Sequence, residues 1–274
     1  MSCRILKGAP VAAEIDKETA ELTAKLSASG VMPTLAIVRV GERDSDIAYE
    51  RAVVRRCGAL GICVRLAALT SEVGQAELMD SIRALNDDHS VHGIILLRPL
   101  PDGLDALAAC AAISPEKDVD GVCPSSMARI YSGRGNGFSP CTAQSCMEIL
   151  AHYGVELEGK HVAVLGRSLV VGKPAAMLLA AANATVTIFH SRSGDYTPAV
   201  RSADIVVSAV GNKGKIRLEP PLQVMVQQRL TLADRCAHFG SAHHLGLPSA
   251  VPLHHLRQVE MIVKLLIRHR GLQQ

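Results

Sequence analysis

The chain has 274 residues, of which 48% are hydrophobic and 20% charged, and its formal net charge is +3. This composition excludes an intrinsically disordered chain. The small charge, without a basic run that carries interleaved aromatics, argues against nucleic-acid binding. The length suffices for two modest domains that share one cleft.

The first lobe is predicted from a regular alternation of helices and strands. Apolar residues recur at helical spacing in some segments and form unbroken runs in others. Glycines at Gly30 and Gly61 are expected to end the first two helices. The alternation predicts parallel strands joined by crossover helices. The expected helices cover residues 10–29, 47–60 and 75–86, and the expected strands cover residues 34–40, 62–66 and 91–97.

The second lobe is expected to begin with a helix over residues 143–153, which links the lobes and which Thr142 is expected to cap. A last amphipathic helix is expected over residues 260–268. Between them we expect strands at 162–165, 184–189 and 204–210 and a helix at 173–181. The predicted domains are residues 1–140, joined by a C-terminal helix at 257–270, and residues 141–256.

The segment His161–Pro174 carries the most informative motif. Gly166 to Gly172 is expected to form a tight loop between a strand and a helix, with Pro174 in the first helical turn. Free backbone N–H groups at such a helix start suit a phosphate. The two glycines are six positions apart, unlike the usual Gly-x-Gly-x-x-Gly pattern. Taken alone, the loop also fits a plain βα turn of any α/β protein.

Further motifs accompany this loop in the chain. They are Val91–Ile95, Pro99–Pro101, Pro115–Gly121, Pro140–Thr142, Gly166–Ser168 and Val171–Pro174. In order and approximate spacing they resemble the bifunctional methylenetetrahydrofolate dehydrogenase/cyclohydrolase family, over about residues 1–212. The resemblance implies a two-lobed α/β fold, with a βαβ lobe that binds tetrahydrofolate and a Rossmann-like lobe that binds NADP.

The resemblance also implies a set of cofactor-binding residues and NADP rather than NAD. An acidic residue after the second strand of a dinucleotide site would favour NAD, but residues 190–192 are His-Ser-Arg and the first acid is Asp195. A 2′-phosphate would find donors and positive charge there. Alternatively, Arg192 is a solvated surface arginine. The expected cofactor residues are Thr142, Gly166, Arg167, Ser168, Gly172, Pro174, Ser191 and Arg192.

In the first lobe, Asp120 matches the family's aspartate that holds the pterin ring. A carboxylate can accept two N–H bonds from the 2-amino pyrimidinone edge. Turn chemistry is the alternative for both Asp118 and Asp120, since Asp before Gly commonly forms turns. Tyr49 matches the family's active-site tyrosine. The expected catalytic residues are Tyr49 and Asp120, and the expected substrate contacts are Tyr49, Leu97, Pro99, Leu100 and Asp120.

Two positions depart from the family pattern. Val53 stands where the family usually has a lysine, and Leu97 where it has a glutamine; the neighbouring basic residues are Arg55, Arg56 and Arg98. Hydride transfer needs placement of the reacting groups and no obligatory side-chain base. Hydrolysis of the methenyl cation needs a group that activates water, and an arginine is a poor base because it stays charged. We therefore expect dehydrogenase activity to be kept and cyclohydrolase activity to be weak or rerouted.

The C-terminal segment also departs from the family. Residues 245–255 stand where the family has a Pro-Val-Pro-Gly-Gly-Val-Gly run. Either a shifted reading frame or true variation explains this difference. Six histidines follow Ala237, but no acidic partner or regular ligand spacing accompanies them, so no metal site is expected. The eight cysteines form no C-x-x-C pair and are expected to be reduced thiols.

The expected function is NADP-dependent oxidation of 5,10-methylenetetrahydrofolate to the methenyl form, with weakened hydrolysis to 10-formyltetrahydrofolate. The resemblance further implies a homodimer and a place in one-carbon metabolism and purine biosynthesis. The chain start lacks a signal peptide and no stretch is apolar enough to span a membrane, so we expect a cytoplasmic protein. One alternative is a catalytically silent paralogue that binds nucleotide or a partner. Another is an unrelated NADP-dependent dehydrogenase of small acids, against which the folate-lobe motifs count.

Overall fold

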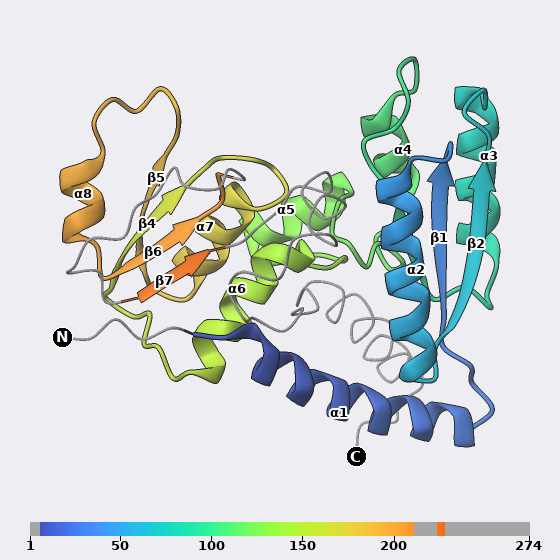
Figure 1. The fold of residues 1–274 in the computed structure, drawn as a ribbon, viewed down its shortest axis with the longest axis horizontal. Coiled ribbons are helices and arrows are strands. Elements are labelled where there is room, and N and C mark those ends of the chain that lie inside the picture. Colours follow the sequence, from blue (N-terminus) through green and yellow to red (C-terminus); the bar gives the residue numbers. More distant parts are fainter. Residues whose placement is uncertain (1–5, 211–223, 228–274) are drawn as a thin grey trace.

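The computed structural model describes residues 6–210 and 224–227. Helices and strands alternate along this part of the chain and form two lobes, each built on a parallel sheet (Figure 1). The two-lobed α/β fold predicted from the sequence is therefore confirmed. The helix expected at 260–268 and the six C-terminal histidines lie outside the described residues.

The first lobe contains a three-stranded sheet in the order β2-β1-β3. All strand pairs are parallel, as the alternation predicted. The strand predicted to end at Leu66 continues to Leu69, and the short helix α4 was not predicted. The elements of this lobe are β1 (Thr34–Val40), α2 (Asp44–Ala59), β2 (Cys63–Leu69), α3 (Gln75–Asp87), β3 (Gly93–Leu96) and α4 (Ala106–Ala112).

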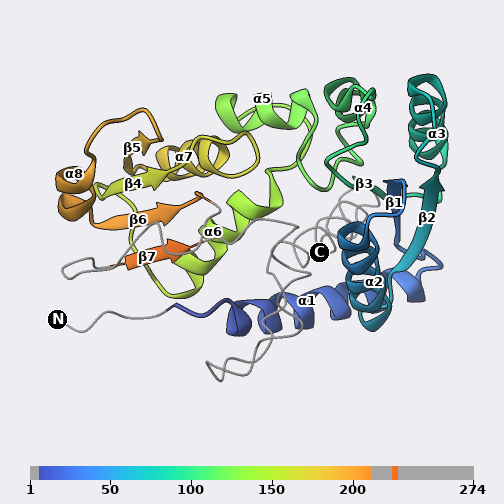
Figure 2. The ribbon, with the colours of Figure 1, turned by 45° about the horizontal axis from the view of Figure 1, so that its top comes forward.

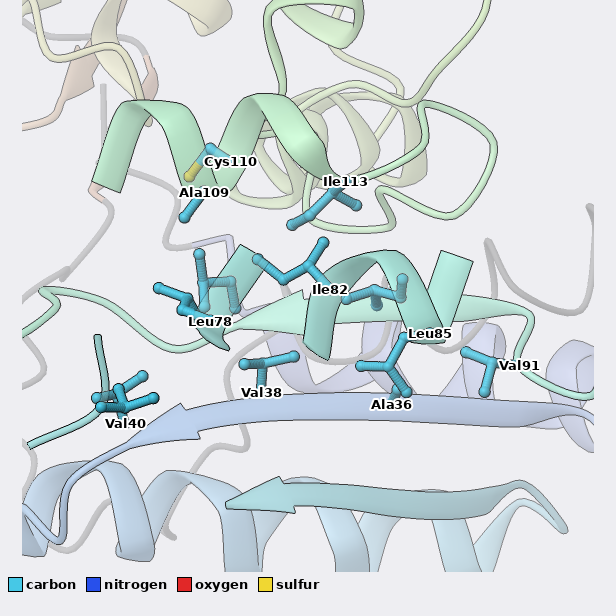
Figure 3. Close-up of a cluster of buried hydrophobic side chains, with 13 residues drawn as sticks. Ala36, Val38, Val40, Leu78, Ile82, Leu85, Val91, Ala109, Cys110 and Ile113 are labelled. Carbon is cyan, nitrogen blue, oxygen red and sulfur yellow. The ribbon is translucent and has the colours of Figure 1, made fainter. Parts of the chain in front are cut away.

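Alternate residues of β1 enter two separate apolar clusters, because successive side chains of a strand point to opposite faces. Val38 faces α3 and α4, where it packs in one cluster with Ile82 and Ile113 (Figure 3). Ile37 faces α2 and packs in the other cluster with Val53. Both faces of the sheet are thus covered, which explains why residues 35–38 of this strand are all apolar.

Helix α1 (Gly8–Ala28) contacts both lobes (Figure 1). Near its start, Val11 and Ile15 pack against Ile149 of α6. Near its end, Leu26 is fully buried in the cluster beneath the first sheet. Because one helix belongs to both cores, the lobes share more than a single linker. The predicted division at residue 140 coincides with the start of α6 and stays a prediction.

The second lobe contains a four-stranded parallel sheet in the order β5-β4-β6-β7. Strand β7 was not predicted, since the resemblance fades after Gly211. The six-residue α8 was also missed, because it is too short for a helical apolar stripe. The elements are α6 (Cys141–His152), β4 (His161–Leu165), α7 (Gly172–Ala181), β5 (Thr185–Phe189), α8 (Thr197–Ser202), β6 (Ile205–Ser208) and β7 (Val224–Gln227).

Helix α5 (Pro124–Ser132) lies between the lobes in sequence and contacts α7 (Figure 2). It was not predicted. Pro124 occupies its first turn, and the Cys123 sulfur accepts a hydrogen bond from the Ser126 amide at 3.4 Å. Gly133 ends the helix with a φ of 68°. Helix α5 itself therefore lies against α7 of the second lobe.

Candidate active site

The first sheet has its topological switch between β1 and β3, since β2 and β3 lie on opposite sides of β1. Ligands of open parallel sheets bind outside the carboxyl ends of strands at such a point. The loops after these two strands contact each other, because the Arg43 guanidinium donates to the Pro99 carbonyl oxygen. The Arg98–Pro99 peptide bond is cis. Most of the predicted substrate residues belong to these loops or to the helix that follows β1.

The predicted substrate residues do not all have accessible side chains. Pro99 is exposed, whereas Leu97 is buried in the apolar cluster under α2. Leu100 is half-buried and packs against the opposite cluster. Tyr49 is half-buried against the first of these clusters. The Leu97 side chain thus packs behind the wall of the site and is not itself exposed to a substrate.

The two departures from the family pattern lie in one apolar cluster. Val53 is 2% exposed and Leu97 is 6% exposed, and both pack in the cluster that Tyr49 joins. An isolated lysine at either position would have to lose its hydration. Arg55 is exposed to solvent on α2. Both replacements therefore make the same part of the site apolar.

Asp118 and Asp120 are close in sequence but differ in structure. Asp118 is fully buried and accepts hydrogen bonds from the Val122 amide at 3.0 Å, the Cys123 amide at 2.8 Å and the Ser126 hydroxyl at 2.7 Å. Asp118 therefore shapes the turn and the start of α5, as the turn-chemistry alternative proposed for it. The Asp120 side chain is 24% exposed, and its carboxylate lies 3.6 Å from the Arg98 guanidinium.

The turn that holds Asp120 packs against the start of the second lobe. Gly121 has a φ of +66°, and a Cβ there would lie 2.6 Å from the Pro140 nitrogen. The Cys141 thiol donates to the Val119 carbonyl oxygen at 2.9 Å. Two of the sequence motifs, Pro115–Gly121 and Pro140–Thr142, therefore meet in space. This contact places Asp120 where the lobes join.

The loop after β4 is built so closely that two positions require glycine. Gly166 has a φ of +115°, and a Cβ there would lie 2.7 Å from the Ala209 carbonyl oxygen. A Cβ on Gly172 would overlap the Gly166 carbonyl group. The Gly166 amide donates to the Phe189 carbonyl oxygen at 2.8 Å. The loop thus lies over the ends of β4, β5 and β6, at the switch point of the second sheet.

Ser168 stabilises this loop by hydrogen bonds to its other end. Its hydroxyl accepts hydrogen bonds from the Val171 amide at 3.2 Å and the Gly172 amide at 3.4 Å, and its carbonyl oxygen accepts from the Lys173 amide at 3.1 Å. Within residues 6–210, the amides of residues 167–170 have no hydrogen-bond partner and their side chains are exposed. These N–H groups fit a phosphate, as the sequence predicted. Pro174 is buried in the first turn of α7.

Thr142 does not have its predicted capping role. Helix α6 begins at Cys141, and its N-cap is Pro140 without a side-chain cap. The Pro140 carbonyl oxygen accepts the first helical bond, from the Gln144 amide at 3.0 Å. The prediction was wrong because Thr142 is already inside the helix. It is 5% exposed, near the junction of the lobes.

The segment after β5 presents positive charge and donors. Ser191, Arg192 and Arg167 are exposed. The Arg192 amide donates to the His190 ring nitrogen at 3.1 Å, which fixes a turn here. Asp195 accepts a hydrogen bond from the Thr197 amide, and hydrogen bonding from Thr197 lowers the pKa of this carboxyl group. The Asp195 carboxylate is therefore already hydrogen-bonded to the first residue of α8.

Cysteines near the Asp120 turn are not activated. The six cysteines of the described residues that the structure characterises carry free thiols. Burial raises the pKa of both Cys110 and Cys123, so these thiols stay protonated at neutral pH. Among residues 6–210 and 224–227 no group of three or more His, Cys, Asp or Glu could hold a metal ion. No helix in the same part is long and apolar enough to cross a membrane.

Family models match both lobes. Residues 6–120 match the catalytic domain of the tetrahydrofolate dehydrogenase/cyclohydrolase family, and residues 140–226 match its NAD(P)-binding domain. The chain belongs to this family. The bifunctional protein FolD of Clostridioides difficile is 43% identical over 208 residues, which are 76% of this chain and 72% of that protein. The FolD of Alkaliphilus oremlandii is 42% identical over 76% of this chain and 73% of its own length.

Solved structures of the family have the same fold. The bifunctional FolD of Campylobacter jejuni superposes with a TM-score of 0.84 at 25% identity and covers 100% of both chains. The Trypanosoma brucei dehydrogenase-cyclohydrolase, complexed with NADP cofactor and inhibitor, gives 0.81 at 30% identity and also covers 100% of both. The family membership confirms the resemblance recognised in the sequence. It also gives the second lobe of this FolD-family protein its role in binding NAD(P).

Proposed function

We propose that the chain oxidises 5,10-methylenetetrahydrofolate to 5,10-methenyltetrahydrofolate with NADP as the hydride acceptor. Family membership supports the reaction, and the glycine-dependent loop at 166–172 fits a cofactor phosphate. The observation that carries the proposal is the contact of Gly121 with Pro140, because it brings the Asp120 turn to the NAD(P)-binding lobe. NADPH formation on addition of both substrates, followed by absorbance, tests it.

The residues proposed for the site have positioning roles. Asp120 accepts N–H bonds from the pterin edge, and the exposed Pro99 forms an apolar contact with the ring. Tyr49, half-buried against the α2 cluster, borders the reacting end of the substrate. Bound NADP would supply the acceptor for the hydride that leaves the methylene bridge when its C–H bond breaks. The folate nitrogen lone pair drives that hydride out, so the chain's main task is orientation.

A catalytically silent paralogue is the less well supported alternative. The apolar replacements Val53 and Leu97 favour it, but they bear on hydrolysis rather than on hydride transfer. Thermal unfolding with NADP and with tetrahydrofolate separates the two readings. Stabilisation by both ligands is expected for the enzyme, because a ligand that binds only the folded state raises the melting temperature.

We expect hydrolysis of 5,10-methenyltetrahydrofolate to be slow. Val53 and Leu97 offer no group that moves a proton, and general acid–base catalysis contributes about 100- to 10,000-fold in rate. The expected cyclohydrolase rate is therefore at least about 100-fold below the rate that a proton-moving side chain at these positions would give. The measurement compares methenyl decay with and without protein, after the dehydrogenase activity of the same sample is established. Hydrolysis as fast as oxidation would contradict this expectation.

The preference for NADP over NAD is expected to depend on Arg167. Arg167→Ala should raise the KM for NADP by about tenfold, because one charge-assisted hydrogen bond to the 2′-phosphate is lost. The KM for NAD, which lacks that phosphate, should change much less. Arg192→Ala tests whether Arg192 shares this role or is a solvated surface residue. Arg83→Ala on α3 is the matched control, since Arg83 pairs with Asp80 in the other lobe.

Further features of the family are proposed on the resemblance alone. They are a homodimer through the second lobe, a cytoplasmic location, a supply of one-carbon units to purine biosynthesis, and domains at residues 1–140 and 141–256 with the segment 257–270 returning to the first. Light scattering on a size-exclusion column tests the dimer. A monomeric mass would remove that part of the proposal and leave the reaction untouched.

A further inference from the structure

Arg98 forms an ion pair with Asp120, the carboxylate proposed to hold the pterin. It follows β3 directly and begins the cis Arg98–Pro99 bond at the switch point of the first sheet. Its neighbour Leu97 is buried in the apolar cluster beneath α2. At the end of this strand the Leu97 side chain is buried, so Arg98 is the residue whose side chain can reach the site.

The contact between Arg98 and Asp120 leaves the Arg98 guanidinium able to donate to another partner. Their closest nitrogen and oxygen atoms are 3.6 Å apart, which is longer than a hydrogen bond. The two side chains are 29% and 24% exposed. The buried Nε atom of Arg98 has no hydrogen-bond partner among the described residues. A guanidinium with five donors is thus held at this place with most of its hydrogen-bonding capacity unused.

We propose that Arg98 binds the substrate directly, by donating a hydrogen bond from its guanidinium to the 4-oxo group of the pterin while Asp120 accepts from the 2-amino edge. This inference rests on the proposed function, in which Asp120 holds the pterin. It makes Arg98 a residue that determines specificity for 4-oxo pterins.

The chemistry of the ring edge fits such a pair. A 2-amino-4-oxopyrimidine presents two neighbouring N–H donors and then a carbonyl acceptor. A carboxylate accepts from the two donors, and a guanidinium beside it donates to the acceptor. The side-by-side placement of Asp120 and Arg98 therefore matches the order of groups on the ring. A 4-amino pterin would instead direct a donor at the guanidinium, and its N3 atom, which then carries no hydrogen, would direct a lone pair at Asp120. A polar site strongly rejects such mismatches.

The test compares two substrates whose pyrimidine edges differ. They are 5,10-methylenetetrahydrofolate and the 5,10-methylene derivative of tetrahydroaminopterin, which carries a 4-amino group. The 4-amino group replaces the carbonyl and removes the N3 hydrogen, so Arg98 and Asp120 each contribute to the discrimination. Turnover is measured rather than binding, because a ring bound in a flipped orientation would not place its methylene bridge correctly. The wild-type protein should prefer the 4-oxo substrate in kcat/KM by about 100-fold. Arg98→Leu should reduce this preference by about tenfold, mainly through a higher KM for the 4-oxo substrate, while the part of the preference that comes from Asp120 remains.

Control variants separate recognition from structure. Arg98→Lys keeps a donor and should restore a large part of the preference. Arg65→Leu removes an arginine that pairs with Asp88 elsewhere in the same lobe, and should leave the preference unchanged. Melting temperatures check that every variant is folded. The KM for NADP should stay the same in all of them, since Arg98 lies in the first lobe.

The outcomes are distinguishable. Equal use of both substrates by the wild-type protein, or an unchanged preference in folded Arg98→Leu, overturns the role of Arg98 and leaves the proposed function standing. No turnover of 5,10-methylenetetrahydrofolate by the wild-type protein overturns the proposed function itself. A preference about tenfold smaller in Arg98→Leu, with recovery in Arg98→Lys, supports the inference.

Discussion

Asp120→Ala is expected to lower kcat/KM for 5,10-methylenetetrahydrofolate by about 100- to 1000-fold. Two hydrogen bonds to a charged acceptor are lost, together worth about 3–4 kcal/mol, and each 1.4 kcal/mol is about tenfold. The Asp120 side chain is partly exposed, and a partly exposed ion pair contributes little to stability, so the melting temperature should change less than in a variant of the buried Asp118. Steady-state kinetics with both substrates measures the effect.

Asp118→Ala is the matched control, two residues away. It removes an acceptor that three buried donors share, at the Val122 amide, the Cys123 amide and the Ser126 hydroxyl. Leaving these donors unsatisfied should cost about 3–5 kcal/mol of unfolding free energy and lower the melting temperature by about 10 °C. If Asp120→Ala loses stability while keeping its kcat/KM, the two aspartates have been assigned the wrong way round.

Gly172→Ala is expected to weaken NADP binding by at least about 100-fold and to destabilise the second lobe. The added methyl group would overlap the Gly166 carbonyl group, and backbone cannot move aside as a flexible side chain can. Overpacking of this kind costs about 1–3 kcal/mol. The loop at 166–172, which should surround the phosphate, must open to relieve this overlap, so the affinity for NADP falls further. Calorimetric titration with NADP, together with thermal unfolding, measures both effects.

Gly58→Ala on α2 is the control for a glycine without a steric role. No atom lies within 4 Å of the position that its Cβ would take. Alanine favours a helix over glycine by about 1 kcal/mol, so this variant should be as stable as the wild type or more so. Normal NADP affinity in Gly172→Ala would show that the loop does not surround the phosphate.

Most of the fold could be predicted from local patterns. The strand at Thr34–Val40 was predicted with its observed bounds, because an apolar run between two glycine-terminated helices leaves little choice. The helix start at Cys141 was missed, because the carbonyl of Pro140 rather than the Thr142 side chain begins the helical bonding. The helices α4, α5 and α8 were missed because six to nine residues are too few for a clear apolar stripe.

The candidate site was only partly predictable. The glycines at 166 and 172 were found from the motif, but their necessity comes from contacts with Ala209 and with each other. Arg98 had no signal beyond being a charge beside a missing glutamine. Its pairing with Asp120 depends on the segment at Asp118, which lies beside Ile94 of β3. Spacing along the chain does not indicate that contact.

The sequence by itself determined the alternation of parallel strands and helices, the family, and the two positions where a lysine and a glutamine are absent. These properties depend on residue type and order, which the chain displays directly. Only the tertiary structure decided that Asp118 is buried while Asp120 is partly exposed, and that Val53 and Leu97 occupy one apolar cluster. Burial and contact between distant residues arise when the chain folds, and two aspartates in one motif differ only in what surrounds them.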